Sequence, residues 1–145
     1  MAHRVFGGRH LTKEEIESLL KEAKIARFCS LNADGTIHAA PVWFKYEAKK
    51  IVTVTPDNSV KARNVKRNKN VTILIDETTP KVRTALIIGT AELDYENVLA
   101  TTISISEKYM PKEQAKQGAE ALYPRTKWAK ITVTPQRITA FDYPP

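Results

Sequence analysis

The chain has 145 residues, 42% of them hydrophobic, which is the size and composition of one ordinary globular domain with a buried core. Its 23 Lys and Arg residues against 16 Asp and Glu give a formal net charge of +7. No apolar run approaches the roughly 18 residues of a membrane span, and the N-terminal residues lack the apolar core of a signal peptide. We therefore expect one domain over residues 1–145 of a cytoplasmic protein without a membrane segment.

The first predicted element is a helix, because Thr12 and Glu15 have capping-box spacing. Apolar residues recur on one face of the segment that follows, at Ile16, Leu19, Leu20 and Ala23. Three β-rich runs come next, separated by residues 33–35 and by a polar stretch over residues 46–50, and we expect an antiparallel meander. The only cysteine, Cys29, lies in the first run and is expected to be a buried small hydrophobe.

A strongly basic segment follows the third run. The stretch "TVTPDNSVKARNVKRN", residues 53–68, breaks at a Pro-Asp-Asn turn and restarts as a short helix near Ser59. The free N–H groups and positive dipole end of such a helix suit a phosphate, and Thr55 and Ser59 add hydroxyl groups. Lys61 and Arg63 lie close enough to bind the same anion. The spacing also fits a second reading, in which Ser59 caps a solvated helix whose cations keep the protein soluble.

The remaining chain adds strands and a helical insert. Two strands are predicted over residues 70–76 and 81–94, with Gly89 as a bulge where the long strand bends. Residues 96–108 and 111–122 read as helices, although "TTISIS" within the first also reads as a strand. Residues 128–143 read as two short strands joined around Pro135 and Gln136. Seven short strands with few helices predict a mainly β protein built on a small antiparallel barrel, homodimeric through its outer apolar faces.

The segment from Gly35 to Asp76 resembles the FMN-binding split barrel of the pyridoxamine 5'-phosphate oxidase-like superfamily. The resemblance extends over nearly the whole chain. It includes the amphipathic first helix, the Asp34-Gly35 hairpin, the strand over residues 41–44 and the long strand through Gly89. Its most specific part is the basic segment, which reads Thr55 followed by Ser59-x-Lys61-x-Arg63-Asn64.

The resemblance implies a homodimer with two cofactor sites at the subunit interface. It implies that the cofactor phosphate is held by Thr55, Ser59, Lys61, Arg63 and Asn64. It further implies that the flavin ring is lined by residues of the strand after the first hairpin, that Thr84 lies near the ring edge, and that Trp128 of the neighbouring subunit completes the pocket. The ring-lining residues are Ala40, Pro41, Val42 and Trp43, with Phe44 next in the chain.

The sequence also departs from the vitamin-synthesising oxidases. Those enzymes carry an Arg where Ala40 stands, a second basic residue where Val60 stands, and a C-terminal Arg-x-His motif. Here Arg137 is present but no His follows it. Oxidation of pyridoxamine 5'-phosphate is therefore not expected.

Other conspicuous residues give weaker signals. His38 alternates with apolar neighbours on a strand, a position that fits solvent, a ligand or the dimer partner. Trp43 and Phe44 point to opposite faces of a strand, so that one is core and the other borders the cofactor slot or the interface. No His, Cys or carboxylate cluster has metal-ligand spacing, and no metal is expected.

The sequence thus predicts a flavin (FMN)-binding oxidoreductase that transfers hydride or electrons between a reduced donor and an unidentified small molecule. No catalytic residue is assigned, because the cofactor would supply the chemistry. Three alternatives stay open: a deazaflavin-dependent reductase, a non-catalytic flavin carrier, and a basic barrel that binds nucleic acid. The last is disfavoured because residues 56–72 contain no Phe, Tyr or Trp on which bases could stack.

Overall fold

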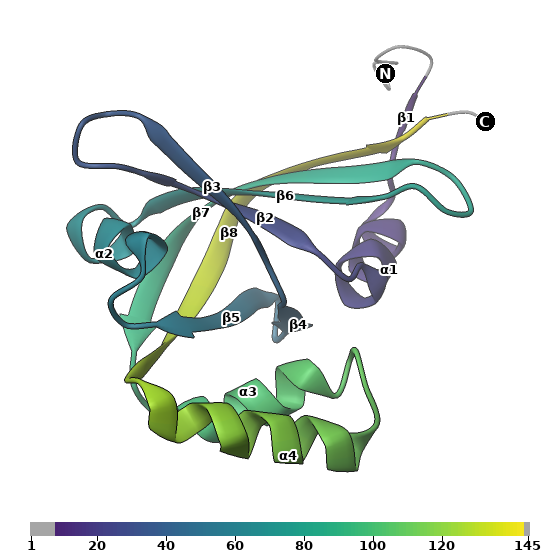
Figure 1. The fold of residues 1–145 in the computed structure, drawn as a ribbon. Coiled ribbons are helices and arrows are strands. Elements are labelled where there is room, and N and C mark those ends of the chain that lie inside the picture. The colour runs from purple at the N-terminus through teal and green to yellow at the C-terminus, as the bar shows by residue number, and fades with distance from the viewer. Residues whose placement is uncertain (1–7, 144–145) are drawn as a thin grey trace.

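The structure, a computed structural model, describes residues 8–143, so most of the N-terminal segment examined for a signal peptide lies outside the described residues. Within this range eight strands form one antiparallel sheet that curls into a half-open barrel, with strand order β3-β2-β6-β7-β8-β5-β4 and β1 paired to β8 (Figure 1). The elements are β1 (Arg9–His10), α1 (Lys13–Glu22), β2 (Ala26–Leu31), β3 (Ile37–Val42), β4 (Lys45–Glu47), β5 (Lys50–Pro56), α2 (Val60–Arg67), β6 (Asn70–Glu77), β7 (Arg83–Asp94), α3 (Val98–Ser106), α4 (Lys112–Leu122), a 3-10 turn (Tyr123–Arg125) and β8 (Trp128–Asp142).

The predicted meander is wrong. Strands β2 and β3 pair with each other, as do β4 and β5, but the second edge of β2 pairs with β6 and that of β5 pairs with β8. Strand β3 ends at Val42, and the chain then crosses from one end of the sheet to the other. The Thr53 hydroxyl donates to the Trp43 carbonyl at 2.7 Å across this crossing. Strands β3 and β4 therefore stand at opposite sheet ends, and β3 keeps one free edge.

The long β7–β8 ribbon forms the back of the barrel. The predicted bulge at Gly89 is confirmed, because Ile88 pairs with Arg137 whereas Gly89 pairs with Pro135. A Cβ at Gly89 would lie 2.6 Å from the Thr134 carbonyl oxygen, so only glycine fits. The prediction of two final strands is wrong, because β8 is continuous. The bulge leaves Gln136 out of the ladder, and Pro135 lies where the pairing is interrupted, so the strand continues past the proline.

The helices close the open sides of the curled sheet (Figure 1). The predicted capping box of α1 is present, with the Glu15 N–H donating to the Thr12 hydroxyl and the Thr12 N–H donating to the Glu15 carboxylate. The "TTISIS" run is helical, because α3 buries Val98, Thr101 and Ile105 at helical spacing. No helix among residues 8–143 is long and apolar enough to cross a membrane.

The core lies inside the curl of the sheet. Its largest fully buried side chains include Leu19, Leu20, Phe28, Phe44, Ile51, Ile73, Ile75, Ile87 and Ile131. Cys29 differs from its prediction, because Ala26, Phe28 and Ser30 take the inner face of β2 and the period of two leaves Cys29 half-buried on the outer face.

Candidate cofactor-binding site

The N-terminal turn of α2 presents unpaired hydrogen-bond donors. Ser59 is the N-cap residue, and its hydroxyl accepts from the Ala62 N–H at 3.2 Å. The buried Thr55 hydroxyl donates to the Ser59 hydroxyl at 2.9 Å, which fixes the position of that oxygen. Within residues 8–143 the N–H groups of Val60 and Lys61 have no hydrogen-bond partner. This end of α2 therefore combines free N–H groups, a fixed hydroxyl and the positive end of the helix dipole.

Lys61 adds a charge that nothing in the described chain balances. Its side chain is half-buried, and the burial lowers the pKa of its ammonium group. Among the hydrogen bonds and ion pairs of residues 8–143, none involves the Lys61 ammonium. Removal of a cation from water without an acidic partner is unfavourable, and such groups concentrate at functional sites. Arg63 is exposed and likewise has no ion-pair partner among the residues described.

The other basic residues of α2 are already occupied. The Lys66 ammonium donates to the Asp57 carboxylate at 2.8 Å, and the Tyr95 hydroxyl donates to the same oxygen at 2.7 Å. These contacts hold the pKa of Asp57 below its ordinary value. They also anchor the turn between β5 and α2. Arg67 also has partners, because its guanidinium donates to the Leu31 carbonyl and to the Asn64 side-chain oxygen, so among the residues described only Lys61 and Arg63 of the helix lack one.

Asn64 holds α2 against the β2–β3 hairpin. Its buried side-chain amide donates to the Ser30 hydroxyl at 3.0 Å and to the Asn32 side-chain oxygen at 2.9 Å, and its own oxygen accepts from Arg67 at 2.8 Å. Lys61 lies three residues before Asn64 and so shares its helix face. Because Asn64 faces Ser30, the same face of α2 directs Lys61 toward the β2–β3 side of the barrel.

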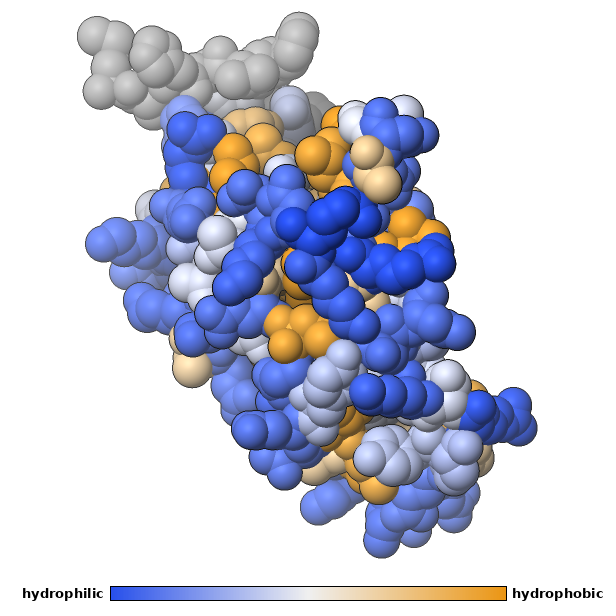
Figure 2. Space-filling view, turned by 90° about the vertical axis from the view of Figure 1, so that its left-hand side faces the viewer, coloured by the Kyte–Doolittle hydropathy of each residue, from blue (hydrophilic) through white to orange (hydrophobic). Residues whose placement is uncertain are grey.

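The outer edge of β3 lies one strand beyond β2, the strand that α2 contacts. Strand β3 pairs only with β2 among the described strands, so its other edge offers unpaired backbone groups. Its inner side carries His38, Ala40 and Val42, and its outer side carries the exposed Ala39 and Pro41. The small side chains leave a flat surface. Figure 2 views the molecule from the α2 side, where hydrophilic side chains cover most of the face and apolar ones show between them.

His38 is a site residue whose role the sequence left open. It pairs in register with Ser30, the residue that α2 contacts through Asn64. Its Nδ1 atom is buried and has no hydrogen-bond partner among the residues described. An unpaired buried nitrogen at this position marks a place where a polar ligand atom would be accommodated. In the sequence, the position of His38 was indicated by its alternation with Ala40 and Val42, which places the three residues on one side of the strand.

The end of β3 carries an aromatic stack. Phe44 is fully buried and Trp43 is 44% exposed, as expected, but both lie between β3 and β4 and not within a strand. The Trp43 ring stacks on the Tyr109 ring with a centroid distance of 4.2 Å and an interplanar angle of 9°. The Tyr109 hydroxyl accepts from the Phe44 N–H at 3.1 Å. The stack therefore fixes the indole just beyond the Val42 end of β3.

The two remaining sequence-predicted residues lie at different distances from this group. Trp128 starts β8 and pairs with Pro56, beside Thr55, and its indole N–H donates to the Leu122 carbonyl at 3.2 Å. Thr84 lies on the outer face of β7, opposite Asp76. It is six residues, or roughly 20 Å along the strand, from Thr90, which pairs with Asn70 just after α2. Within one chain, residues 55–64 and β3 therefore lie near each other, whereas Thr84 lies apart from both.

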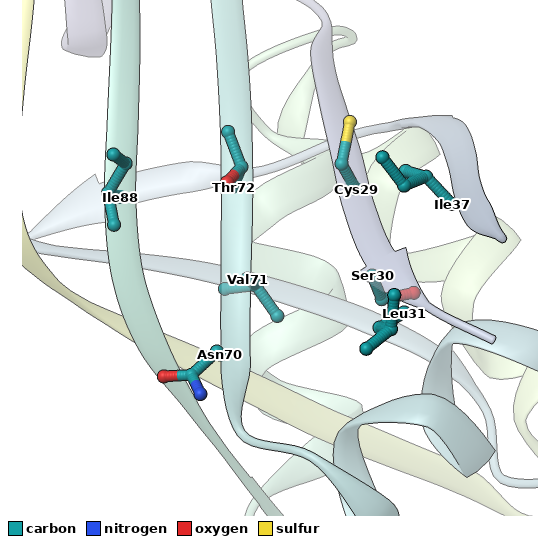
Figure 3. Close-up of a pocket in the computed structure, with 8 residues that line it drawn as sticks. All are labelled: Cys29, Ser30, Leu31, Ile37, Asn70, Val71, Thr72 and Ile88. Carbon is teal, nitrogen blue, oxygen red and sulfur yellow. The ribbon is translucent and has the colours of Figure 1, made fainter. Parts of the chain in front are cut away.

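Part of the outer face of the sheet is apolar. A hollow of about 450 Å³ lies over β2, β6 and β7 (Figure 3). Ile37 is 73% exposed, Leu31 40% and Leu86 39%. The residues lining the hollow are Cys29, Ser30, Leu31, Ile37, Asn70, Val71, Thr72 and Ile88. Burial raises the pKa of the Cys29 thiol, which keeps it protonated and unreactive.

Solved structures with the same fold support this architecture. The conserved hypothetical protein Rv2991 from Mycobacterium tuberculosis aligns with a TM-score of 0.78 and 20% identity, over 91% of this chain and 85% of that chain. A FAD-binding protein from Mesorhizobium loti gives 0.71 and 13%, over 94% and 99%. An F420 reductase gives 0.67 and 19%, over 84% and 94%. At these identities the likeness establishes the fold, which is the predicted split barrel.

Family membership follows from the sequence itself. No significant match was found among proteins with curated descriptions. The Pyridoxamine 5'-phosphate oxidase family, however, matches residues 12–141, from the N-cap of α1 to the end of β8. The matched range contains α2, the β3 edge and the aromatic stack. The chain therefore belongs to the pyridoxamine 5'-phosphate oxidase family.

Proposed function

We propose that this protein is an FMN-binding oxidoreductase that transfers hydride or electrons between a reduced donor and a small molecule, with residues 1–145 acting as one cofactor-binding domain. The observation that carries the proposal is Lys61, a half-buried ammonium at the N-terminal turn of α2 that has no acidic partner among residues 8–143. Phosphate is the anion that such a turn accommodates best. A flavin mononucleotide would bring its phosphate there and its ring to the adjacent edge of β3.

The residues present fit this cofactor. Lys61, Arg63, the Ser59 hydroxyl and the free N–H groups of α2 would bind the phosphate directly. Thr55 would act behind them, since its hydroxyl is buried and donates to Ser59. Asn64 would position α2, because all its side-chain hydrogen bonds go to protein groups.

The ring would lie along β3, where the slot needs to be flat and largely apolar with a few polar atoms. Ala40, Pro41 and Val42 supply the apolar surface, and Trp43 borders one end. The orphaned Nδ1 of His38 and the free backbone edge of β3 supply polar partners. The bound flavin would supply the redox chemistry, while the chain binds it, orients it and limits access of water to one ring face.

We further propose that two copies of the chain form a homodimer through the apolar outer face. Exposed Leu31, Ile37 and Leu86 mark a surface that a monomer would leave in water. Thr84 lies on this same face and away from α2 of its own chain, so it would reach the ring of the partner's cofactor. Trp128 would complete the pocket of the neighbouring subunit, as the family resemblance implies.

The two flavin-related alternatives share this site. The structural likeness to an F420 reductase favours testing a deazaflavin coenzyme beside FMN. A carrier without turnover would have the same cofactor contacts and no substrate. The nucleic-acid alternative has less support, because α2 carries no aromatic side chain and its Lys66 is paired with Asp57.

The deciding experiment is the visible spectrum of the purified protein, followed by titration of the apoprotein with FMN, riboflavin and the deazaflavin coenzyme. We expect FMN to bind at least about tenfold more tightly than riboflavin, because only FMN has the phosphate. Equal affinity for FMN and riboflavin would contradict the phosphate assignment. A protein indifferent to all three would contradict the proposed function, and steeply salt-dependent binding of random oligonucleotides would then support the basic barrel.

The dimer is tested separately by analytical ultracentrifugation. Ile37→Glu places a charge in the apolar outer face and should shift the protein toward monomer. Gln117→Glu on the exposed side of α4 adds the same charge elsewhere and should leave the mass unchanged. A wild-type monomer at all concentrations would reject the proposed interface.

A further inference from the structure

A second half-buried lysine, Lys108, lies just after α3. Its ammonium group is 3.6 Å from the centre of the Phe44 ring and donates to the Phe44 carbonyl at 3.3 Å. Within residues 8–143 no carboxylate lies within ion-pair distance of it. One cation–π contact and one carbonyl compensate only part of the hydration that the ammonium has lost. A negatively charged ligand would therefore stabilise the Lys108 ammonium group further.

Lys24 brings a second positive charge to the same place. Its ammonium donates to the Lys108 carbonyl at 2.8 Å. The Lys24 and Lys108 ammonium groups lie 5.5 Å and 5.7 Å from the centre of one ring, that of Tyr109. Lys24 has no ion-pair partner among the residues described. Two like charges held beside one ring repel each other, so a shared anion would stabilise both.

The position of the pair is fixed relative to the proposed ring slot. The Tyr109 hydroxyl bonds to the main chain at Phe44 and at Lys24, and its ring stacks on Trp43. Lys24 lies two residues before Ala26, which pairs with Val42 at the end of β3. The two ammonium groups thus stand at the Val42 end of β3, whereas Asn64 and Arg67 of α2 contact the hairpin end.

Burial, followed by the neighbouring charge of Lys24, lowers the pKa of Lys108 to about 8. Glu77 acts in the opposite direction but makes no ion pair with it. A lysine adapted only to a structural role is usually paired or left in solvent. The partial desolvation, the paired cations and the rigid aromatic support together resemble a binding site more than a solvated surface.

We propose that Lys24 and Lys108 bind the carboxylate of a small organic reactant whose remaining part extends over β3 toward the cofactor ring. This inference rests on the proposed function for its role, because the ring slot along β3 makes the bound molecule a reactant. The anion site itself stands on the geometry of the two lysines. It selects carboxylate-bearing small molecules over neutral analogues of the same shape.

The test uses benzoate and its neutral isostere benzamide as probes. Each is titrated into the apoprotein and into the FMN-loaded protein, and binding is followed by NMR through the indole N–H of Trp43 and the amide of Tyr109. The variants are Lys108→Met and Lys24→Met, with Lys108→Arg to keep the charge. Lys116→Met, on the exposed side of α4, is the matched control for net charge. Melting temperature shows whether each variant folds.

We expect benzoate to perturb Trp43 and Tyr109 with at least about tenfold higher affinity than benzamide. Lys108→Met and Lys24→Met should each lower benzoate affinity about tenfold, while Lys108→Arg and Lys116→Met leave it nearly unchanged. If Lys108→Met unfolds the protein, the exposed Lys24 provides the same test.

Equal benzoate affinity in Lys24→Met, Lys108→Met and Lys116→Met would overturn the proposal and leave Lys108 as a structural lysine bound to Phe44. Loss of FMN affinity in Lys108→Met without a change in benzoate affinity would also overturn it, by assigning the lysine to the cofactor. Lysine-dependent benzoate binding in a protein that binds no flavin would support the anion site and reject the proposed function.

Discussion

The N-terminal turn of α2 and the corner after α3 each hold a half-buried lysine, but they surround it differently. Lys61 has a fixed Ser59 hydroxyl and free N–H groups beside it, and within the part of the chain that the structure describes no aromatic ring or carbonyl compensates its charge. Lys108 rests on the Phe44 ring and carbonyl, next to Lys24. Burial lowers the pKa of both. Neutral donors around Lys61 suit a multiply charged phosphate, whereas the compensated pair after α3 suits a weaker, exchangeable carboxylate.

The largest effect should come from Ser59→Asp. This substitution keeps the helix cap that Ser59 provides but opposes its contact with the phosphate. Aspartate caps a helix as well as serine does, so the melting temperature should change little. Its negative charge would repel the phosphate, and FMN affinity should fall about 100-fold or more. Asn68→Asp at the other end of α2 adds the same charge as a control. A tightly FMN-binding Ser59→Asp protein would place the phosphate elsewhere.

Lys61→Ala should have the next largest effect. A charge-assisted contact to phosphate contributes about 1.5 to 3 kcal/mol, which corresponds to a loss of FMN affinity of about 10- to 150-fold. Riboflavin affinity should stay the same because riboflavin lacks the phosphate. Lys69→Ala removes one exposed charge from the same basic segment and serves as the control. Parallel losses in both variants would indicate long-range attraction instead of a contact.

Anion binding at the Lys24–Lys108 pair after α3 should depend on pH. Because the pKa of Lys108 is lowered to about 8, it loses its charge as the pH rises through that value. Benzoate affinity should therefore be constant below about pH 7 and fall about tenfold by pH 9. The titratable groups facing Lys108 are Lys24, Glu77 and Tyr109, and burial raises the pKa of the Tyr109 hydroxyl, so that it stays neutral over this range.

Two variants check the origin of this dependence. In Lys108→Met the step between pH 7 and 9 should disappear, and the weaker residual affinity should be flat. In Lys116→Met the step should persist. A step of unchanged size in Lys108→Met would assign the titration to another group.

The smallest effect is expected for Tyr109→Phe. The change removes the hydroxyl that accepts from the Phe44 N–H and donates to the Lys24 carbonyl, and it leaves the ring stack with Trp43 in place. Unfolding free energy should fall by about 1 kcal/mol, as measured by urea denaturation. Tyr123→Phe, at an exposed position, should cost nothing measurable. A Tyr109→Phe protein as stable as wild type would show that the stack alone fixes this corner.

Local signals in the sequence predicted the parts of the fold that depend on neighbouring residues. The capping box of α1 and the cap of α2 at Ser59 are each set by side chains within three residues of the helix start. The bulge at Gly89 was visible because glycine alone permits the close approach of a second strand. These features need no knowledge of distant contacts.

Long-range pairing was beyond the reach of the same reasoning. Whether β3 pairs with β5 or leaves an edge free depends on where β6 and β8 attach, and no local pattern encodes this. The same holds for Asn64, which the resemblance assigned to the phosphate but which the fold engages with Ser30 and Asn32. Lys108 gave no signal at all, because its burial comes from Phe44, more than sixty residues away in the chain.

The sequence by itself determined the family, the basic turn after Pro56 and the cap that exposes its N–H groups, since these follow from residue type and short spacing. Only the tertiary structure decided which cations remain unpaired. Lys66 is neutralised by Asp57, while Lys61 and Lys108 are partly removed from water and form no ion pair with any described residue. The physical reason is that desolvation and ion pairing depend on what the folded chain places around each charge.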